Sequence, residues 1–119
     1  MRILHVDDSS ADAMLVRRLL AKSAIDVELV HCMTREEAVE YIRTGPFDLV
    51  LLDDYLGLVR GEQALEALIG AGYSGPTVML TGIVREGAEA SLSHMGCNVW
   101  LDKNHLDAQV LEDAIREVT

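Results

Sequence analysis

The residues of this sequence that could do chemistry together are polar side chains that follow short apolar runs. They are Asp7 and Asp8 after residues 3–6, Asp53 and Asp54 after 49–52, Thr81 after 78–80, and Lys103 after 99–101. If these runs are parallel strands, their carboxyl ends meet at one edge of a sheet, where ligands bind in open α/β folds. Three or four acidic groups, a hydroxyl and an amine would then converge at that edge.

Carboxylates held close together repel one another, which raises their pKa values unless a cation lies between them. Hard oxygen ligands with room for water suit Mg²⁺, so we expect a magnesium ion at this edge. With the charge offset by the ion, one carboxylate can act as a nucleophile toward phosphorus. Asp53 is the best placed candidate because it follows the most apolar strand. Lys103 and Thr81 could stabilise the transferred phosphoryl oxygens.

The elements that must position these groups can be predicted from the hydrophobic pattern. Five β-rich runs, at residues 3–6, 27–30, 49–52, 78–80 and 99–101, alternate with helical patterns. This alternation predicts an α/β domain with a doubly wound, five-stranded parallel sheet and helices on both faces. Thr34 and Glu37 form a capping-box pattern at a helix start, while Gly70 and Gly72 predict a helix end.

Apolar stripes at helical spacing predict the faces that pack on the sheet. They comprise Leu15 and Leu19 in the first helix, Ala64, Leu65 and Leu68 in the third, and Val110, Leu111, Ala114 and Val118 in the last. Residues 85–95 predict a fourth helix that is mobile, because glycine and serine weaken helix propensity there.

Composition excludes several function classes. The 119 residues include 10 basic and 20 acidic side chains, and the net charge of −10 removes the electrostatic driving force for direct nucleic-acid binding. Cys32 and Cys97 lack a disulfide or zinc spacing, which is typical of free thiols in a reducing cytosol. The apolar runs are far shorter than a membrane span. We therefore expect a soluble, cytoplasmic domain with neither a nucleic-acid nor a membrane partner.

Four segments resemble the receiver family of two-component response regulators, in the right order and over essentially the whole chain. They are Ile-Leu-His-Val-Asp-Asp-Ser from Ile3, Phe-Asp-Leu-Val-Leu-Leu-Asp from Phe47, Val-Met-Leu-Thr-Gly from Val78 and Trp-Leu-Asp-Lys from Trp100. The resemblance implies a chemotaxis-regulator-like, flavodoxin-like fold with strand order 2-1-3-4-5. It also implies a phosphoprotein that acts in phosphorelay signal transduction.

The resemblance further implies a role for each site residue. The roles are phosphoacceptor for Asp53, direct metal ligand for Asp8, acidic neighbour acting largely through water for Asp7, backbone-carbonyl ligand for Tyr55, switch hydroxyl for Thr81 and phosphate-pairing amine for Lys103. Trp100 stands where the family usually has a switching Tyr or Phe. Plain core packing is an equal alternative for this tryptophan.

The function that the resemblance implies is Mg²⁺-dependent phosphoryl transfer to Asp53, which switches a protein-interaction face. Such a domain is not a free-standing enzyme, although it assists its own phosphorylation and dephosphorylation. The implied partners are a histidine kinase or phosphotransfer protein, and an unknown output protein or covalently attached output domain; homodimerisation stays open. Residues 1–119 would form a single receiver domain, which could be one piece of a longer signalling protein.

Three positions depart from the commonest family pattern. Gly57 and Arg60 stand where Pro and Asp are frequent after the acceptor, and Asn104 replaces the proline that usually follows the lysine. A peptide bond before a residue other than proline strongly prefers trans, because cis costs about 2.5 to 4 kcal/mol. The path of the chain beyond Lys103 is therefore expected to differ from the usual one.

Two other classes of function stay open. The first is a receiver-like adaptor that docks a partner without phosphorylation, for which the altered acceptor loop is the support. The second is a flavodoxin-like cofactor binder that uses Ser9 and Ser10 as a phosphate loop, against which the neighbouring Asp7 and Asp8 count, because they would repel a phosphate without a metal. Tyr55 and Ile83 could line the mouth of the pocket, although surface packing explains them equally well.

Overall fold

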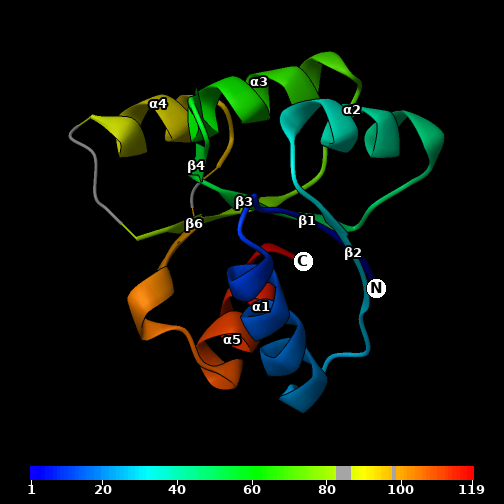
Figure 1. Ribbon diagram of the computed structural model, residues 1–119, viewed down its shortest axis with the longest axis vertical. Coiled ribbons are helices and arrows are strands. Elements are labelled where there is room, and N and C mark those ends of the chain that lie inside the picture. Colours follow the sequence, from blue (N-terminus) through cyan, green and yellow to red (C-terminus); the bar gives the residue numbers. More distant parts are fainter. Residues whose placement is uncertain (83–86, 98) are drawn as a thin grey trace.

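The computed structural model describes residues 1–82, 87–97 and 99–119 (Figure 1). The elements are β1 (Arg2–Val6), α1 (Ser10–Lys22), β2 (Glu28–Cys32), α2 (Arg35–Thr44), β3 (Leu49–Asp53), β4 (Tyr55–Leu56), β5 (Val59–Arg60), α3 (Gly61–Gly70), β6 (Thr77–Thr81), α4 (Ala88–His94), β7 (Val99–Asp102), the 3₁₀ helix η1 (Lys103–His105) and α5 (Ala108–Val118). Apart from the short strands β4 and β5, strands and helices therefore alternate as the sequence predicts.

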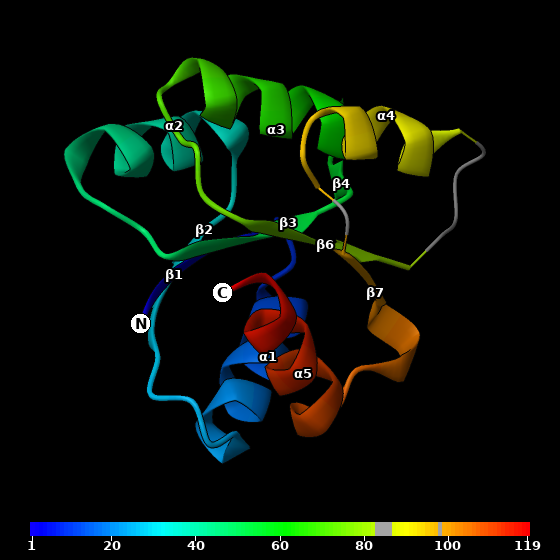
Figure 2. The ribbon, with the colours of Figure 1, turned by 180° about the vertical axis from the view of Figure 1, so that it is seen from behind.

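Five parallel strands form one sheet in the order β2-β1-β3-β6-β7, which confirms the predicted doubly wound fold and strand order. Helices α1 and α5 cover one face of the sheet, and α2, α3 and α4 cover the other (Figures 1 and 2). A short antiparallel hairpin, β4–β5, lies between β3 and α3 and was not predicted. The hairpin follows the strand that ends in Asp53, so it lies beside the predicted site.

The core has two halves, one on each face of the sheet. Ile3 packs with α1 and α5 residues such as Val16 and Ile115, whereas Leu4 and Val6 pack with residues of α2 and α3. This division follows from the alternation of side chains along β1. All residues of the two central strands, β3 and β6, are buried, so the backbone that carries Asp53 is surrounded by packed side chains.

Side-chain caps begin the helices near the site. The Ser9 hydroxyl accepts a hydrogen bond from the Asp12 amide at 3.2 Å, and the Thr34 hydroxyl accepts one from the Glu37 amide at 3.1 Å. The predicted helix start at Thr34 is thus confirmed. Gly72, with a φ of 101°, follows the end of α3 in the left-handed region that glycine tolerates.

Two predicted apolar stripes are partly wrong. Leu15 is 42% exposed, and α1 buries Ala13, Val16 and Leu20 instead, with Leu19 partly buried beside them. In α5, Val110 is 37% exposed while Leu111 is fully buried. The reason is the 100° rotation per helical residue: adjacent apolar residues cannot share the centre of one stripe, and the packed sheet selects which of them is inside.

The predicted fourth helix, residues 85–95, is observed as α4 from Ala88 to His94. Ile83 and Arg85 lie outside the described residues, and the expected mobility of this helix stays a prediction. The Lys103–Asn104 peptide bond is trans, as expected, since the described residues contain no cis peptide bond. None of the helices in the described ranges is long and apolar enough to cross a lipid bilayer.

Candidate functional site

Three carboxylates converge at the carboxyl edge of the sheet. Asp7 and Asp8 directly follow β1 and Asp53 ends β3; one oxygen from each lies within 4.8 Å of the others. Asp7 and Asp53 are buried, whereas Asp8 is exposed. This donor set of hard oxygens, open to water on the side of Asp8, fits a hexacoordinate cation such as Mg²⁺.

Asp54 does not join these carboxylates, although the sequence allowed for a fourth. Its side chain is fully buried, and a Cβ added to Gly61 would lie only 2.6 Å from its Oδ1. The backbone amide of Gly61 also donates to the Asp54 carbonyl at 2.9 Å. Asp54 therefore joins the hairpin region to the start of α3, and the contact explains why a glycine fits at position 61.

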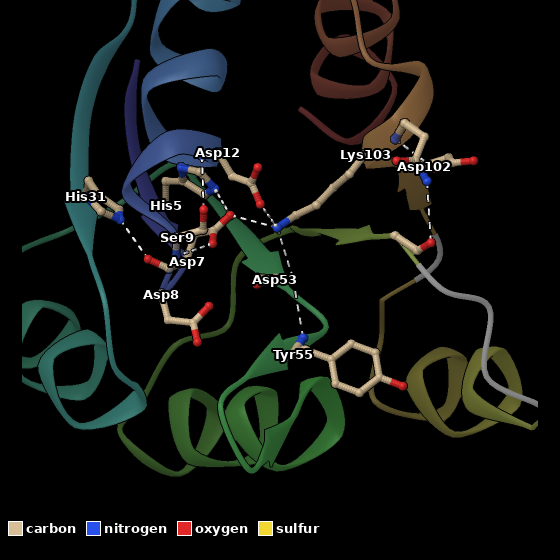
Figure 3. Close-up of polar contacts among 12 residues, drawn as sticks. His5, Asp7, Asp8, Ser9, Asp12, His31, Asp53, Tyr55, Asp102 and Lys103 are labelled. Carbon is tan, nitrogen blue, oxygen red and sulfur yellow. Dashed lines mark hydrogen bonds and ion pairs between the residues drawn. The ribbon is translucent and has the colours of Figure 1, made fainter.

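Lys103 contacts these carboxylates through its ammonium, which is the only ammonium group among the described residues of the site. Its Nζ lies 3.2 Å from Asp53 Oδ1, 2.9 Å from Asp7 Oδ2 and 2.8 Å from Asp12 Oδ2 (Figure 3). Burial opposes the charge on Lys103, but the hydrogen bonds to Asp12 and Asp7 and the attraction to Asp53 outweigh it and raise its pKa. The ammonium is thus charged over the whole physiological range.

The two buried carboxylates have opposite electrostatic environments. Burial, followed by repulsion from Asp7, raises the pKa of Asp53 to about 6, although Lys103 and the Tyr55 amide oppose this rise. Burial also acts to raise the pKa of Asp7, but contacts with His5, the Ser9 amide and Lys103 lower it to about 2. A cation beside Asp53 would favour its ionised form, which is the form that can attack phosphorus.

Two histidines lie next to Asp7. His31 Nε2 lies 2.8 Å from the Asp7 backbone carbonyl, and the Ser9 amide donates to Asp7 Oδ1 at 2.9 Å. His5 is fully buried, and its Nε2 lies 3.5 Å from Asp7 Oδ2, which is long for a hydrogen bond. Burial lowers the pKa of His5 and favours its neutral form.

The β4–β5 hairpin contributes backbone amides to the site. The Tyr55 amide donates to Asp53 Oδ1 at 3.3 Å, and the Gly57 amide donates to Asp8 Oδ2 at 3.0 Å. The guanidinium of Arg60 lies 4.6 Å from the centre of the Tyr55 ring, a cation–π contact across the hairpin. The hairpin therefore holds Tyr55 next to Asp53 through its backbone amide, and the role of its carbonyl as a metal ligand stays a prediction.

Thr81 and Trp100 lie on the two strands at the other side of Asp53. Thr81 ends β6, is 8% exposed and pairs in register with Asp102 of β7, so it belongs to the same sheet edge as Lys103. Trp100 is partly buried against the core beneath α2, α3 and α4. The structure thus places Trp100 in core packing, and its part in a switch stays a prediction.

Sequence reasoning missed Asp12, His5 and His31. A signal for Asp12 exists, because Ser9 followed three residues later by an acidic residue is a helix-start pattern, which puts Asp12 in the first helical turn after β1. The histidines carry no such signal, since each lies inside a short strand, His5 in the buried part of β1 and His31 in the partly buried β2.

Comparisons with solved structures define the class of fold. The chain matches a CheY-like response regulator receiver domain protein from Methanospirillum hungatei with a TM-score of 0.82 and 25% identity, covering 98% of this chain and 90% of the other. It matches a two-component response regulator from Clostridium difficile with a TM-score of 0.85 and 19% identity, covering 99% and 94%.

The sequence itself matches the model of the response regulator receiver domain over residues 3–116, so the chain belongs to this family. It is 37% identical over 81 residues to the transcriptional regulatory protein DltR of Streptococcus agalactiae, covering 68% of this chain and 35% of the relative. It is 30% identical to the histidine-protein kinase BarA of Escherichia coli, covering 87% and 11%. The chain therefore spans about a third or less of these relatives' lengths. Phosphorylation of an aspartate in phosphorelays is a general feature of the family.

Proposed function

We propose that this domain is a phosphoacceptor switch of a cytoplasmic two-component pathway, in which Asp53 takes a phosphoryl group from the phosphohistidine of a histidine kinase or phosphotransfer protein. The observation that carries the proposal is the position of Asp53, whose Oδ1 lies 3.2 Å from the Lys103 ammonium and whose carboxylate groups with those of Asp7 and Asp8. A carboxylate between a fixed cation and a cation-binding site is suited to attack phosphorus.

Asp8, Asp53 and the backbone carbonyl of Tyr55 would hold Mg²⁺, with Asp7 acting largely through water. The ion, when bound, supplies the positive charge that keeps Asp53 ionised and offsets the charge of the incoming phosphate. A carboxylate oxygen of Asp53 forms a bond to phosphorus as the bond to the histidine nitrogen breaks, and the electron pair returns to that imidazole. Lys103 and Thr81 then donate hydrogen bonds to the transferred oxygens.

The same site supports the return to the resting state. Water attacks the phosphorus of the aspartyl phosphate, and the bond between phosphorus and the Asp53 oxygen breaks. Asp53 is left as a carboxylate, and inorganic phosphate leaves with the water oxygen, while the protons of that water stay on phosphate or pass to solvent. Between the two steps the phosphoryl group carries about 1.5 to 2 negative charges, which draw Lys103 and Thr81 toward it. Thr81 ends β6 and Lys103 follows β7, so their movement would change the surface that these strands form with α4. That surface would then bind an output protein or an attached output domain.

Intact mass after incubation with Mg²⁺ and a small acyl phosphate tests the proposal. We expect a gain of one phosphoryl group that requires Mg²⁺, disappears with a chelator and is absent in Asp53→Asn. Asp54→Asn, checked for folding by circular dichroism, is the matched control, because this neighbouring carboxylate lies outside the group of three; it should still be modified. A folded wild-type chain that gains no mass from any donor would instead support a phosphorylation-independent adaptor.

A further inference from the structure

Asp12 is a carboxylate at the site that belongs to none of the family-like segments described above. It lies in the first turn of α1, where its amide is fixed by the Ser9 hydroxyl. Its side chain reaches across to Lys103, with Oδ2 at 2.8 Å from Nζ (Figure 3). This is the shortest of the three contacts that Lys103 makes with carboxylates.

Lys103 has three N–H donors, and three carboxylates surround them. The contacts with Asp12 and Asp7, both from the β1–α1 segment, are shorter than the contact with Asp53 at 3.2 Å. A phosphoryl group on Asp53 brings further oxygens that need a donor. For Lys103 to serve them fully, at least one contact on the β1–α1 side must lengthen or break.

The contact with Asp12 is the one that can open. Asp7 is fully buried and is held by the Ser9 amide, whereas the side chain of Asp12 is 43% exposed and can turn into water. While the contact between Asp12 and Lys103 is formed, the negative charge of Asp12 also offsets the positive charge of the Lys103 ammonium, which would stabilise the phosphoryl oxygens.

We propose that Asp12 is a positioning residue that restrains Lys103 in the unphosphorylated domain and thereby slows phosphoryl transfer to Asp53. This inference rests on the proposed function of Asp53. It makes Asp12 a residue that tunes the response of this particular chain, because it acts through Lys103.

The test compares phosphorylation rates of folded variants with a small acyl phosphate at saturating Mg²⁺. Asp12→Asn keeps the shape and the backbone hydrogen bond to Ser9 but removes the charge, and we expect the rate to rise about two- to fivefold, the size expected of a partly exposed ion pair. Asp12→Glu restores a carboxylate and should return the rate toward that of the wild type. Asp26→Asn removes the same charge from an exposed position before β2 and should leave the rate unchanged.

The rate change must depend on Lys103. In a Lys103→Ala background, Asp12→Asn should no longer alter the residual rate. In the metal-free wild type, ¹⁵N-detected ammonium signals should show Lys103 protected from hydrogen exchange, and Asp12→Asn should reduce this protection. An equal or lower rate in Asp12→Asn, an effect that persists without Lys103, or unchanged ammonium protection would each overturn the restraint. A wild-type chain that accepts no phosphoryl group would overturn the proposed function first, and the restraint on transfer with it.

Discussion

The backbone amide of Gly57 donates a hydrogen bond to Oδ2 of Asp8 at 3.0 Å. Gly57 lies in the turn between β4 and β5 with a φ of 65°, a left-handed conformation that glycine adopts without strain. A proline, which is frequent at the corresponding position in the family that the sequence resembles, has no N–H to donate and a fixed negative φ. The departure at position 57 therefore creates a backbone contact to the most exposed carboxylate of the site.

Replacing Gly57 by alanine should destabilise the domain by about 1 kcal/mol, because an L-residue is strained at this φ. Gly70→Ala is the matched control: Gly70 ends α3 without a positive φ, and a Cβ there would meet nothing within 4 Å. That variant should be neutral or slightly stabilising. Chemical denaturation of both variants measures the difference; equal stabilities would show that the turn is not held in this conformation.

Mg²⁺ should change the environment of the Gly57 amide, because an ion held by Asp8, as proposed, would share that carboxylate with the amide. In a magnesium titration followed by ¹⁵N–¹H NMR, the Gly57 signal is expected to move and to saturate together with the signals of residues next to Asp53. Asp8→Asn should weaken the apparent affinity by about tenfold or more, since it removes a charged ligand. A Gly57 signal that stays fixed while others saturate would place the ion elsewhere.

The raised pKa of Asp53 makes stability depend on pH in a defined window. Its folded pKa, about 6, lies above the ordinary value of 3.8, so the folded chain binds more protons than the unfolded chain between these values. Metal-free stability should therefore fall as pH rises from about 4 to 6. Asp53→Asn removes this penalty and should be more stable than the wild type by about 1 to 3 kcal/mol at pH 7.5 but nearly equal at pH 4.

Urea denaturation with a chelator at several pH values measures this difference. Asp7 affects the stability of the fold in a separate pH range, because its pKa is lowered to about 2 and its contribution is lost only as pH falls below about 4. Asp26→Asn serves as the control for loss of one negative charge. Added Mg²⁺ should narrow the stability gap at pH 7.5, since a bound cation would stabilise the ionised Asp53 carboxylate. A gap between Asp53→Asn and wild type that is constant from pH 4 to 7.5 would contradict the assignment.

Much of this site could be predicted from the sequence because its residues end strands. Apolar runs mark β1, β3, β6 and β7, and in a parallel sheet the residues after them must meet at one edge, so the sequence alone predicts that Asp53 lies near Lys103. Asp12 escaped this reasoning because it lies in a helix and its contact with Lys103 spans 91 residues of sequence. The β4–β5 hairpin could not be predicted because strands of two residues show no measurable alternation of apolar and polar side chains. The position of Asp54 outside the group of three carboxylates could not be predicted for the same reason.

Helix α1 offers a direct test of which apolar residues face the core. Val16 is 2% exposed and Leu15 is 42% exposed, although the two are adjacent and similarly apolar. Val16→Ala should cost about 2 kcal/mol of unfolding free energy through lost burial and a residual cavity, whereas Leu15→Ala should cost well under 1 kcal/mol. Thermal and urea denaturation compare the pair. A larger cost at Leu15 would mean that the helix is rotated from the orientation described, which would also move Asp12 away from Lys103.

Lys103→Ala should separate phosphorylation from the conformational response. Asp53 and the carboxylates proposed to hold Mg²⁺ remain, so some phosphorylation should persist, but the ammonium expected to follow the phosphoryl group is lost. Trp100 is the single tryptophan and precedes Lys103 by three residues on β7, so its fluorescence reports on this strand. We expect the wild type to change its emission on phosphorylation and Lys103→Ala, at equal phosphorylation by mass, to change little.

Lys22→Ala, at the end of α1 in the opposite part of the domain, controls for loss of one positive charge and should respond as the wild type does. If phosphorylated Lys103→Ala gave the full wild-type change, the signal would reach β7 by another route, and Thr81 on the neighbouring strand would be the next residue to replace.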